Sequence, residues 1–209
     1  MQSIVTADSA RVVCSDLRIR ADRSLLSDFS WEHIAGGIAW LAGTNGSGKS
    51  SLLRVLAGWQ APTGGAVSWP GLRAGRIRYF NPGMSAGGDL RVGDFVALIQ
   101  SITNASSEDE VSALYPATVP ATQRFGKLST GEAKRILLWA LLRSGDGPLL
   151  LDEPYEHLSR DAKDTLTGVL RQCAAHAVVI VATNQDVSMR ENDALLTFNG
   201  DRIEVSHAS

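Results

Sequence analysis

Short runs made only of apolar residues punctuate the chain. They occur at Ile38–Ala42, Leu149–Leu151 and Val178–Ala182. Wholly apolar runs of this length are typical of parallel strands that are covered on both faces. A looser alternation of apolar and polar residues predicts two further strands, Val12–Ile19 and Leu25–Ile34. The pattern therefore predicts a buried parallel sheet preceded by other strands.

Helical spacing of apolar residues fills much of the remaining chain. The predicted helices are Ser50–Ala57, Leu90–Thr103, Thr130–Leu142 and Asp161–Cys173, with a further helix start at Ser106–Glu110. Short strands are predicted at Ala66–Trp69 and Arg76–Phe80, and a closing hairpin at Ala194–Phe198 and Arg202–Val205. A helical insert thus separates two parts of an α/β core.

Composition limits the function classes. A chain of 209 residues is long enough for one compact domain, and 44% hydrophobic with 20% charged residues is ordinary for a soluble protein. The net charge of −2 lacks the strong positive charge that is typical of nucleic-acid-binding proteins. Cys14 and Cys173 lie too far apart in the sequence for a ligand pattern, so neither a disulfide framework nor a zinc site is expected. No stretch approaches the ~20 apolar residues of a membrane helix, so we expect membrane contact only through partners.

A glycine-rich stretch follows the first apolar run. Gly43–Ser50 fits G-x-x-x-x-G-K-[ST] between a predicted strand and a predicted helix, which is the context that this phosphate-binding motif needs. Glycines let the backbone approach phosphate, and the backbone N–H groups and the helix N-terminus face the anion. Lys49 would contact the outer phosphates and Ser50 would bind Mg²⁺. The expected nucleotide-binding residues are Gly43, Thr44, Asn45, Gly46, Ser47, Gly48, Lys49, Ser50 and Ser51.

Two carboxylates end the second apolar run. Asp152 and Glu153 directly follow Leu149–Leu151, and the carboxyl end of a parallel strand faces the ligand crevice. A strand that ends in a polar turn is the alternative interpretation. Together with the phosphate motif, the pair favours Asp152 as the residue that holds Mg²⁺ through its water shell and Glu153 as the general base for water.

Leu128–Glu132 precedes the strongest predicted helix and resembles the LSGGQ signature of ABC ATPases. Leu128, Ser129 and Gly131 match, whereas Thr130 and Glu132 are variants. An ordinary capping box, with Ser129 as the N-cap and Glu132 three residues later, is compatible with this role. The order of phosphate loop, helical insert, signature and Asp-Glu strand resembles the ABC ATPase domain over nearly the whole chain.

The resemblance implies a P-loop NTPase fold. It would have a RecA-like parallel-sheet core at 1–89 and 143–209, an antiparallel β part near the N-terminus and a helical subdomain at about 90–142. In that family, two such domains close around two ATP molecules, and Ser129 and Gly131 would face the nucleotide of the other subunit. The resemblance also implies Mg²⁺, a homodimer, transmembrane permease subunits and a peripheral location on the cytoplasmic face of the bacterial inner membrane.

Four positions depart from the family pattern. Asn81 stands where a glutamine meets Mg²⁺ or water, and Ser159 stands where an aspartate lies at the dimer seam. Asn184 replaces the switch histidine, so it can donate to the γ-phosphate but carries no charge. Arg20 occupies the place of the tyrosine that stacks on adenine; a solvated basic loop is an equally good interpretation. We expect slow hydrolysis for which Glu153 is still essential.

Further similarities point to a subfamily, the small haem-exporter ATPases of cytochrome c maturation, the CcmA type. They lie at Asp22–Ser27, Pro62–Trp69, Asn81–Gly83 and Asp152–Tyr155. The resemblance implies that ATP hydrolysis powers haem export, or release of a haem-loaded chaperone, in c-type cytochrome biogenesis. Two alternatives are open: the ATPase of another small ABC exporter, and a weakly active module that uses ATP to dimerise. No haem ligand is expected on this chain.

Overall fold

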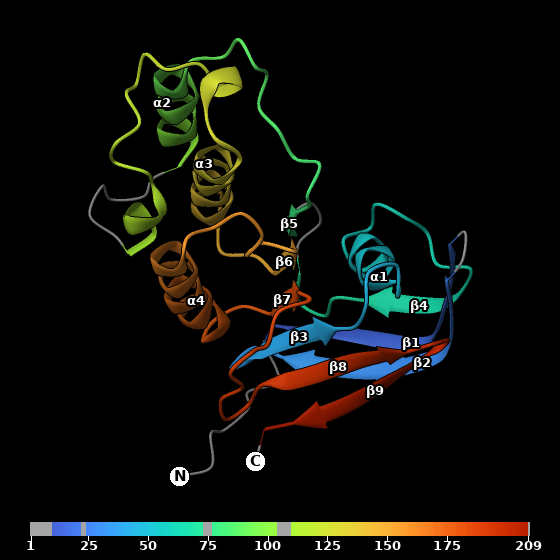
Figure 1. Cartoon of the computed structure of the whole chain (residues 1–209). Helices are drawn as coiled ribbons and strands as arrows, with labels where there is room; N and C mark the ends of the chain where they lie inside the picture. Colours follow the sequence, from blue (N-terminus) through green and yellow to red (C-terminus); the bar gives the residue numbers. More distant parts are fainter. Residues whose placement is uncertain (1–9, 22–23, 73–76, 104–109, 209) are drawn as a thin grey trace.

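The computed structural model describes residues 10–21, 24–72, 77–103 and 110–208 (Figure 1). Three of the sequence predictions fall partly outside these residues. They are the helix start at 106–109, the first residue of the strand predicted from Arg76, and the subfamily similarity at Asp22 and Arg23.

A six-stranded sheet forms the centre of the molecule. Its strand order is β5-β6-β7-β3-β8-β9, parallel except for β9. The strands are β3 (Ile38–Ala42), β5 (Arg78–Phe80), β6 (Leu149–Asp152), β7 (Val179–Ala182), β8 (Ala194–Asn199) and β9 (Arg202–His207). Every residue of β6 and β7 is buried, because helices or a second sheet cover both faces. The predicted parallel strands and the closing hairpin are confirmed.

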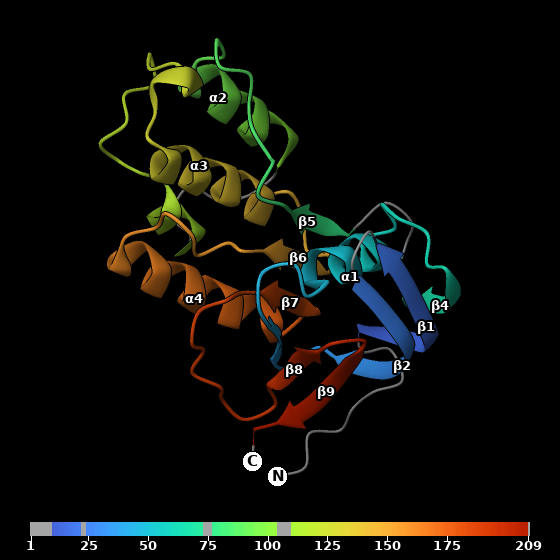
Figure 2. The same cartoon turned by 45° about the vertical axis from the view of Figure 1, so that its right-hand side comes forward.

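Alternate residues of these strands face two separate cores. One core lies toward α3 (Thr130–Arg143) and α4 (Arg160–Ala174), and the other lies toward α1 (Lys49–Leu56) and a second sheet. The second sheet is antiparallel, in the order β2-β1-β4. Its strands are β1 (Arg11–Ala21), β2 (Ser24–Ile34) and β4 (Gly64–Ser68). Figure 2 shows α1 between the two sheets, and α3 and α4 on the opposite side of the parallel strands.

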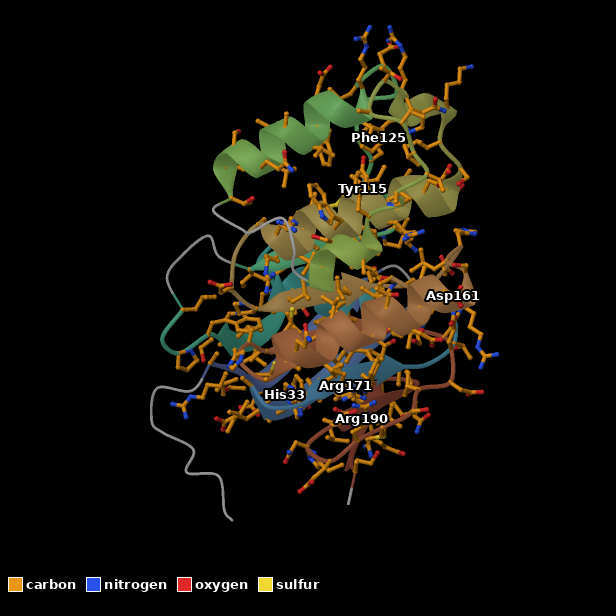
Figure 3. All side chains as sticks on the ribbon, turned by 90° about the vertical axis from the view of Figure 1, so that its left-hand side faces the viewer. His33, Tyr115, Phe125, Asp161, Arg171 and Arg190 are labelled. Atoms are coloured by element: carbon orange, nitrogen blue, oxygen red, sulfur yellow. The ribbon has the colours of Figure 1, made fainter. Side chains whose placement is uncertain are left out.

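The outer helical part packs more loosely. It contains α2 (Val92–Ile102) and the short 3₁₀ turns η1 (Glu110–Leu114) and η2 (Phe125–Lys127). Val92 is the buried residue of α2, and Phe95 meets Phe125 edge to face at 5.2 Å between ring centroids. In Figure 3, Phe125 and Tyr115 lie in this outer part, whereas Asp161 and Arg171 lie on α4 next to the parallel sheet. Within the described residues, no helix is both long and apolar enough to cross a membrane.

Candidate functional site

The glycine-rich loop joins β3 to α1. Gly43 and Gly48 have φ values of 153° and 108°, which side chains rarely adopt. A Cβ atom on Gly43 would also lie 2.8 Å from the Ser47 hydroxyl oxygen. Gly48 is the N-cap of α1, so the loop delivers the first N–H groups of this helix to its concave side. This is the anion-binding geometry that the motif predicts.

Lys49 lies inside the curve of this loop. Only 5% of the residue is exposed, and its Nζ donates to the carbonyl oxygens of Gly43 at 2.7 Å and Thr44 at 3.2 Å. The same ammonium group lies 3.7 Å from Glu153 Oε1. A cavity of about 360 Å³ opens here, and it is lined by residues 45–51, Arg54 and Glu153. The loop and the carboxyl end of β6 therefore share one site.

Asp152 is the last residue of β6 and is 2% exposed. Burial raises the pKa of its carboxyl group, and a hydrogen bond from Ser50 and the charge of Lys49 oppose that rise. Its Oδ1 is buried and has no hydrogen-bond partner among the described residues. A buried carboxylate oxygen without a partner beside a serine hydroxyl is an oxygen donor set that suits Mg²⁺. The residues present therefore fit this ion.

Glu153 follows in a left-handed backbone conformation, with φ 46°. Its N–H donates to the Ala182 carbonyl oxygen at 2.9 Å, and its Oε2 accepts from the Asn184 backbone N–H at 3.2 Å. Burial raises the pKa of this carboxyl group, whereas Asn184 N–H and Lys49 oppose the rise. A carboxylate with a raised pKa at the mouth of an anion site is equipped to accept a proton from water.

The N-terminus of α3 forms the predicted capping box. Ser129 Oγ accepts from the Glu132 N–H at 3.2 Å, and Glu132 Oε2 accepts from the Ser129 N–H at 2.9 Å. These bonds lower the pKa of Glu132. Gly131 packs against the turn after β6, since a Cβ atom there would lie 2.6 Å from the His157 carbonyl oxygen. Ser129 and Gly131 do not line the cavity at the phosphate loop of their own chain.

The four residues that depart from the family pattern take different places. Asn81 Oδ1 accepts from the Gly83 N–H at 2.9 Å, so this amide closes its own turn after β5. Ser159 is the N-cap of α4. Asn184 is exposed beside Glu153, which it holds through its backbone. Arg20 is exposed on β1, and its neighbour Ile19 lines a small hollow at the start of α1.

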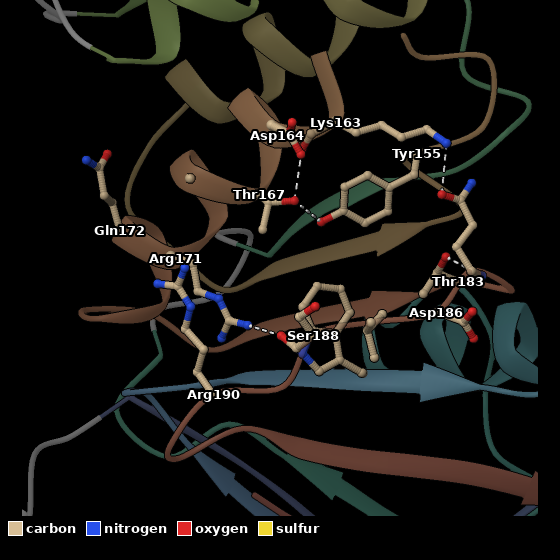
Figure 4. Close-up of a pocket in the computed structure, with 14 residues that line it drawn as sticks. Tyr155, Lys163, Asp164, Thr167, Arg171, Gln172, Thr183, Asp186, Ser188 and Arg190 are labelled. Atoms are coloured by element: carbon tan, nitrogen blue, oxygen red, sulfur yellow. Dashed lines mark hydrogen bonds between the residues drawn. The ribbon is translucent and has the colours of Figure 1, made fainter. Parts of the chain in front are cut away.

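A larger cavity of about 610 Å³ lies beside α4 and the segment after β7 (Figure 4). Lys163 Nζ donates to Gln185 Oε1 at 2.9 Å, and Arg171 donates to the Ser188 carbonyl oxygen at 3.1 Å. Tyr155 OH and Thr167 Oγ1 lie 3.1 Å apart. These bonds fix both the turn after β6 and the loop that carries Asn184 to one helix.

A family profile described as ABC transporter matches residues 26–156 of this chain. The chain belongs to the ABC transporter family. Its architecture of parallel core, antiparallel β part and helical insert is the P-loop NTPase fold that the sequence predicts, and that prediction is confirmed. The chain is accordingly an ATP-binding protein of this family, whose members hydrolyse ATP.

This chain is similar to ATP-binding proteins whose names state different transport roles. The cytochrome c biogenesis ATP-binding export protein CcmA of Zymomonas mobilis is 30% identical over 190 residues, which cover 90% of this chain and 84% of the relative. The zinc import ATP-binding protein ZnuC of Halorhodospira halophila is 35% identical over 187 residues, covering 87% and 70%. A putative ABC transporter ATP-binding protein from Pyrococcus furiosus has the same fold, with a TM-score of 0.74 at 19% identity, covering 88% of this chain and 96% of that one.

Lys134 and Asp193 are two of the buried polar residues that sequence reasoning missed. Lys134 on α3 bonds to the turn that carries Glu153, and Asp193 joins β3 to α4. For Lys134 there was a signal, because it lies one helical turn before Leu138 on the apolar face of α3. No sequence pattern marked Asp193, since two of its partners, Ile38 and Trp40, are more than 150 positions away in the sequence.

Proposed function

We propose that this chain is the ATP-hydrolysing subunit of a transporter that serves c-type cytochrome biogenesis, where hydrolysis powers haem export or release of a haem-loaded chaperone. The observation that carries the ATPase part is the Glu153 carboxylate, which lies between Lys49 and the Asn184 N–H at the mouth of the phosphate loop. The assignment of haem as the cargo is supported by the CcmA relatives, which align with this chain over most of both lengths and whose name states cytochrome c biogenesis.

The residues of the site divide the work. Loop N–H groups and Lys49 bind the phosphates, and the exposed guanidinium of Arg20 stacks on adenine. Ser50 and Asp152 would hold Mg²⁺, which when bound supplies positive charge to the phosphates. Glu153 accepts the proton of the attacking water, and Asn184 donates its side-chain N–H to the γ-phosphate. Since Asn184 adds no positive charge, turnover is slow.

Asn81 is the weakest member of this set. Its amide oxygen already accepts the Gly83 N–H, so it meets the metal or the water only by giving up that bond. We infer that Asn81 shapes the turn after β5 and takes part in hydrolysis to a smaller degree than Asp152 and Glu153. The turn leads from β5 toward α2, where a partner's movement would reach it.

A second copy of the chain completes the site in this proposal. Ser129 and Gly131 lie outside the cavity of their own phosphate loop, which supports a role toward ATP bound by the other subunit. The helical part at about 90–142 is the surface that would dock on transmembrane permease subunits, while 1–89 and 143–209 form the core. The complex would lie on the cytoplasmic face of the bacterial inner membrane.

Capture of the intact complex tests the cargo. Glu153→Gln protein, which should bind ATP without releasing it as products, is recovered with ATP from its native membranes and its partners are identified by mass spectrometry. Haem-handling and cytochrome c assembly proteins are expected. A different permease would overturn the cargo and leave the ATPase assignment intact. The ZnuC relative, whose name states zinc import, makes such a permease the second candidate.

Turnover of the purified protein tests the chemistry. We expect Glu153→Gln to lower the ATPase rate by at least ~100-fold, the usual contribution of a positioned general base. A parent protein that dimerises with ATP but turns it over no faster than Glu153→Gln would instead be a binding module. Lys49→Ala is the matched control, because it should lose ATP binding itself.

A further inference from the structure

A buried lysine joins the signature helix to the turn that carries the general base. Lys134 lies in α3 and is 8% exposed. Its Nζ donates to the carbonyl oxygens of Glu153 at 2.7 Å and Glu156 at 3.0 Å. The same ammonium group lies 5.8 Å from the centre of the Phe80 ring. A buried charge is tolerated only where such partners replace water, so these two bonds are what hold the side chain in place.

The turn that Lys134 grips has an unfavourable backbone. Glu153 and His157 both have positive φ, at 46° and 62°, in a region that side chains rarely adopt. Such conformations persist only where the surroundings fix them. Lys134 bonds to carbonyl groups at residues 153 and 156, and Gly131 packs against the carbonyl oxygen of residue 157. One helix therefore supports the turn along its whole length.

The backbone of Glu153 is fixed at both of its polar groups. Its N–H donates to the Ala182 carbonyl oxygen, and its own carbonyl oxygen accepts from Lys134. The carboxylate then points to Lys49 on one side and to the Asn184 N–H on the other. Without the Lys134 bonds, the carbonyl group of Glu153 would no longer be held, and the position of the carboxylate would change. No group that contacts ATP would be removed.

We propose that Lys134 is a positioning residue for ATP hydrolysis, which acts by holding the main chain of Glu153; this rests on the function proposed above. Lys134 also connects the N-terminal part of α3 to Glu153, the general base of the same chain. Gly131 and Lys134 are about one helical turn apart and contact opposite ends of the turn at 153–157. A displacement of α3 at Ser129 would therefore be transmitted to Glu153.

Variants of Lys134 test the proposal through the split between kcat and KM. Lys134→Met keeps the length and removes the donors, so kcat should fall by roughly 10-fold to 100-fold, as for a misplaced catalytic group. KM for ATP should change by less than about 2-fold, because no phosphate contact is lost. Lys134→Arg, which keeps several N–H donors, should restore most of kcat. Lys127→Met, the same change at an exposed position nearby, should leave both constants unchanged.

A double variant separates positioning from a general structural role. If Lys134 acts through Glu153, adding Lys134→Met to Glu153→Gln should lower the residual rate by less than about 2-fold, because the group being positioned is already gone. An equal fall in both backgrounds would overturn the proposal, as would parental kcat in Lys134→Met. Should the Met variant fail to fold, Lys134→Gln replaces it, with a smaller loss of kcat expected and the same overturning result.

Failure of the proposed function gives a different result. In that case, the parent protein hydrolyses ATP no faster than Glu153→Gln, whatever stands at position 134. The Lys134 proposal alone fails when Glu153→Gln abolishes turnover while Lys134→Met does not change it. The two inferences can therefore be judged in one series of purified proteins.

Discussion

The parallel sheet and the outer helix α2 differ in how completely the molecule covers them. Every residue of β6 and β7 is buried, whereas α2 buries Val92 and leaves Leu98 56% and Ile102 67% exposed. Asp152 and Glu153, to which we assign roles in hydrolysis, lie at the carboxyl end of β6. Contacts within this chain therefore hold Glu153 in place, whereas this chain leaves two large apolar side chains of α2 largely uncovered.

The largest expected effect is on the free energy of unfolding, when the buried carboxylate of Asp193 is removed. Asp193 is fully buried and accepts from the N–H groups of Ile38 at 2.9 Å and Arg190 at 3.0 Å, from Trp40 Nε1 at 3.1 Å and from the Arg171 guanidinium. Asp193→Ala would leave a mostly buried guanidinium without its carboxylate, which destabilises a fold by about 3–5 kcal/mol. Urea unfolding measures this. A loss below ~1 kcal/mol would mean that the hydrogen bonds of Asp193 are not essential for stability.

The same carboxylate predicts how stability depends on pH. Burial alone would raise the pKa of Asp193, but the hydrogen bonds from Arg171 and from backbone N–H groups lower it overall. Its stabilisation is therefore present above the unfolded pKa of about 3.9 and is lost as the pH falls through the lower folded pKa. Asp193→Asn should show a shallower acid decline in unfolding free energy than the parent protein. Parallel declines would show that another carboxylate governs acid unfolding.

The second-largest effect is expected from a cavity in the sheet. Leu150 is fully buried in the core between β6, α1 and the antiparallel sheet. Leu150→Ala removes its contacts and leaves a void, so the free energy of unfolding should fall by about 3 kcal/mol. Denaturant unfolding without nucleotide gives this value. A fall below about 1 kcal/mol would indicate that the two sheets can close over the void.

Sequence and structure agree best where one periodic rule decides the answer. The wholly apolar runs predicted the parallel strands. Because Asp152 and Glu153 follow one of these runs, the sequence also predicted that the carboxyl end of β6 lies beside the phosphate loop. Boundaries depended on pairing instead: β4 begins at Gly64, earlier than predicted, because Gly64 pairs with Arg18 of β1. Residues that act through distant partners could not be predicted. Asp193 is the clearest case, since its role exists only once β3, α4 and β8 are assembled.

A smaller effect is expected at the start of α3, where the two regions meet. Ser129→Ala removes the side-chain acceptor of the capping box, so stability should fall by about 1 kcal/mol. Ser159→Ala at the start of α4 is the matched control, and its smaller expected effect follows from a longer cap bond of 3.4 Å and no reciprocal carboxylate. Thermal or urea unfolding of nucleotide-free protein ranks the two. Equal losses would mean that the shorter cap bond and the bond from Ser129 Oγ to Glu132 Oε2 add nothing to stability.

The smallest effect is expected on α2 itself. Leu98→Ala deletes the same atoms as Leu150→Ala, but the side chain is 56% exposed, so the unfolding free energy should change by less than about 0.5 kcal/mol. In the membrane capture, the same variant should recover less permease than the parent, because contiguous apolar side chains lose contact area when one is truncated. A loss of stability close to that of Leu150→Ala would mean that α2 packs within the free chain. Its exposed leucine would then be part of a core, and the contrast between the two regions would be wrong.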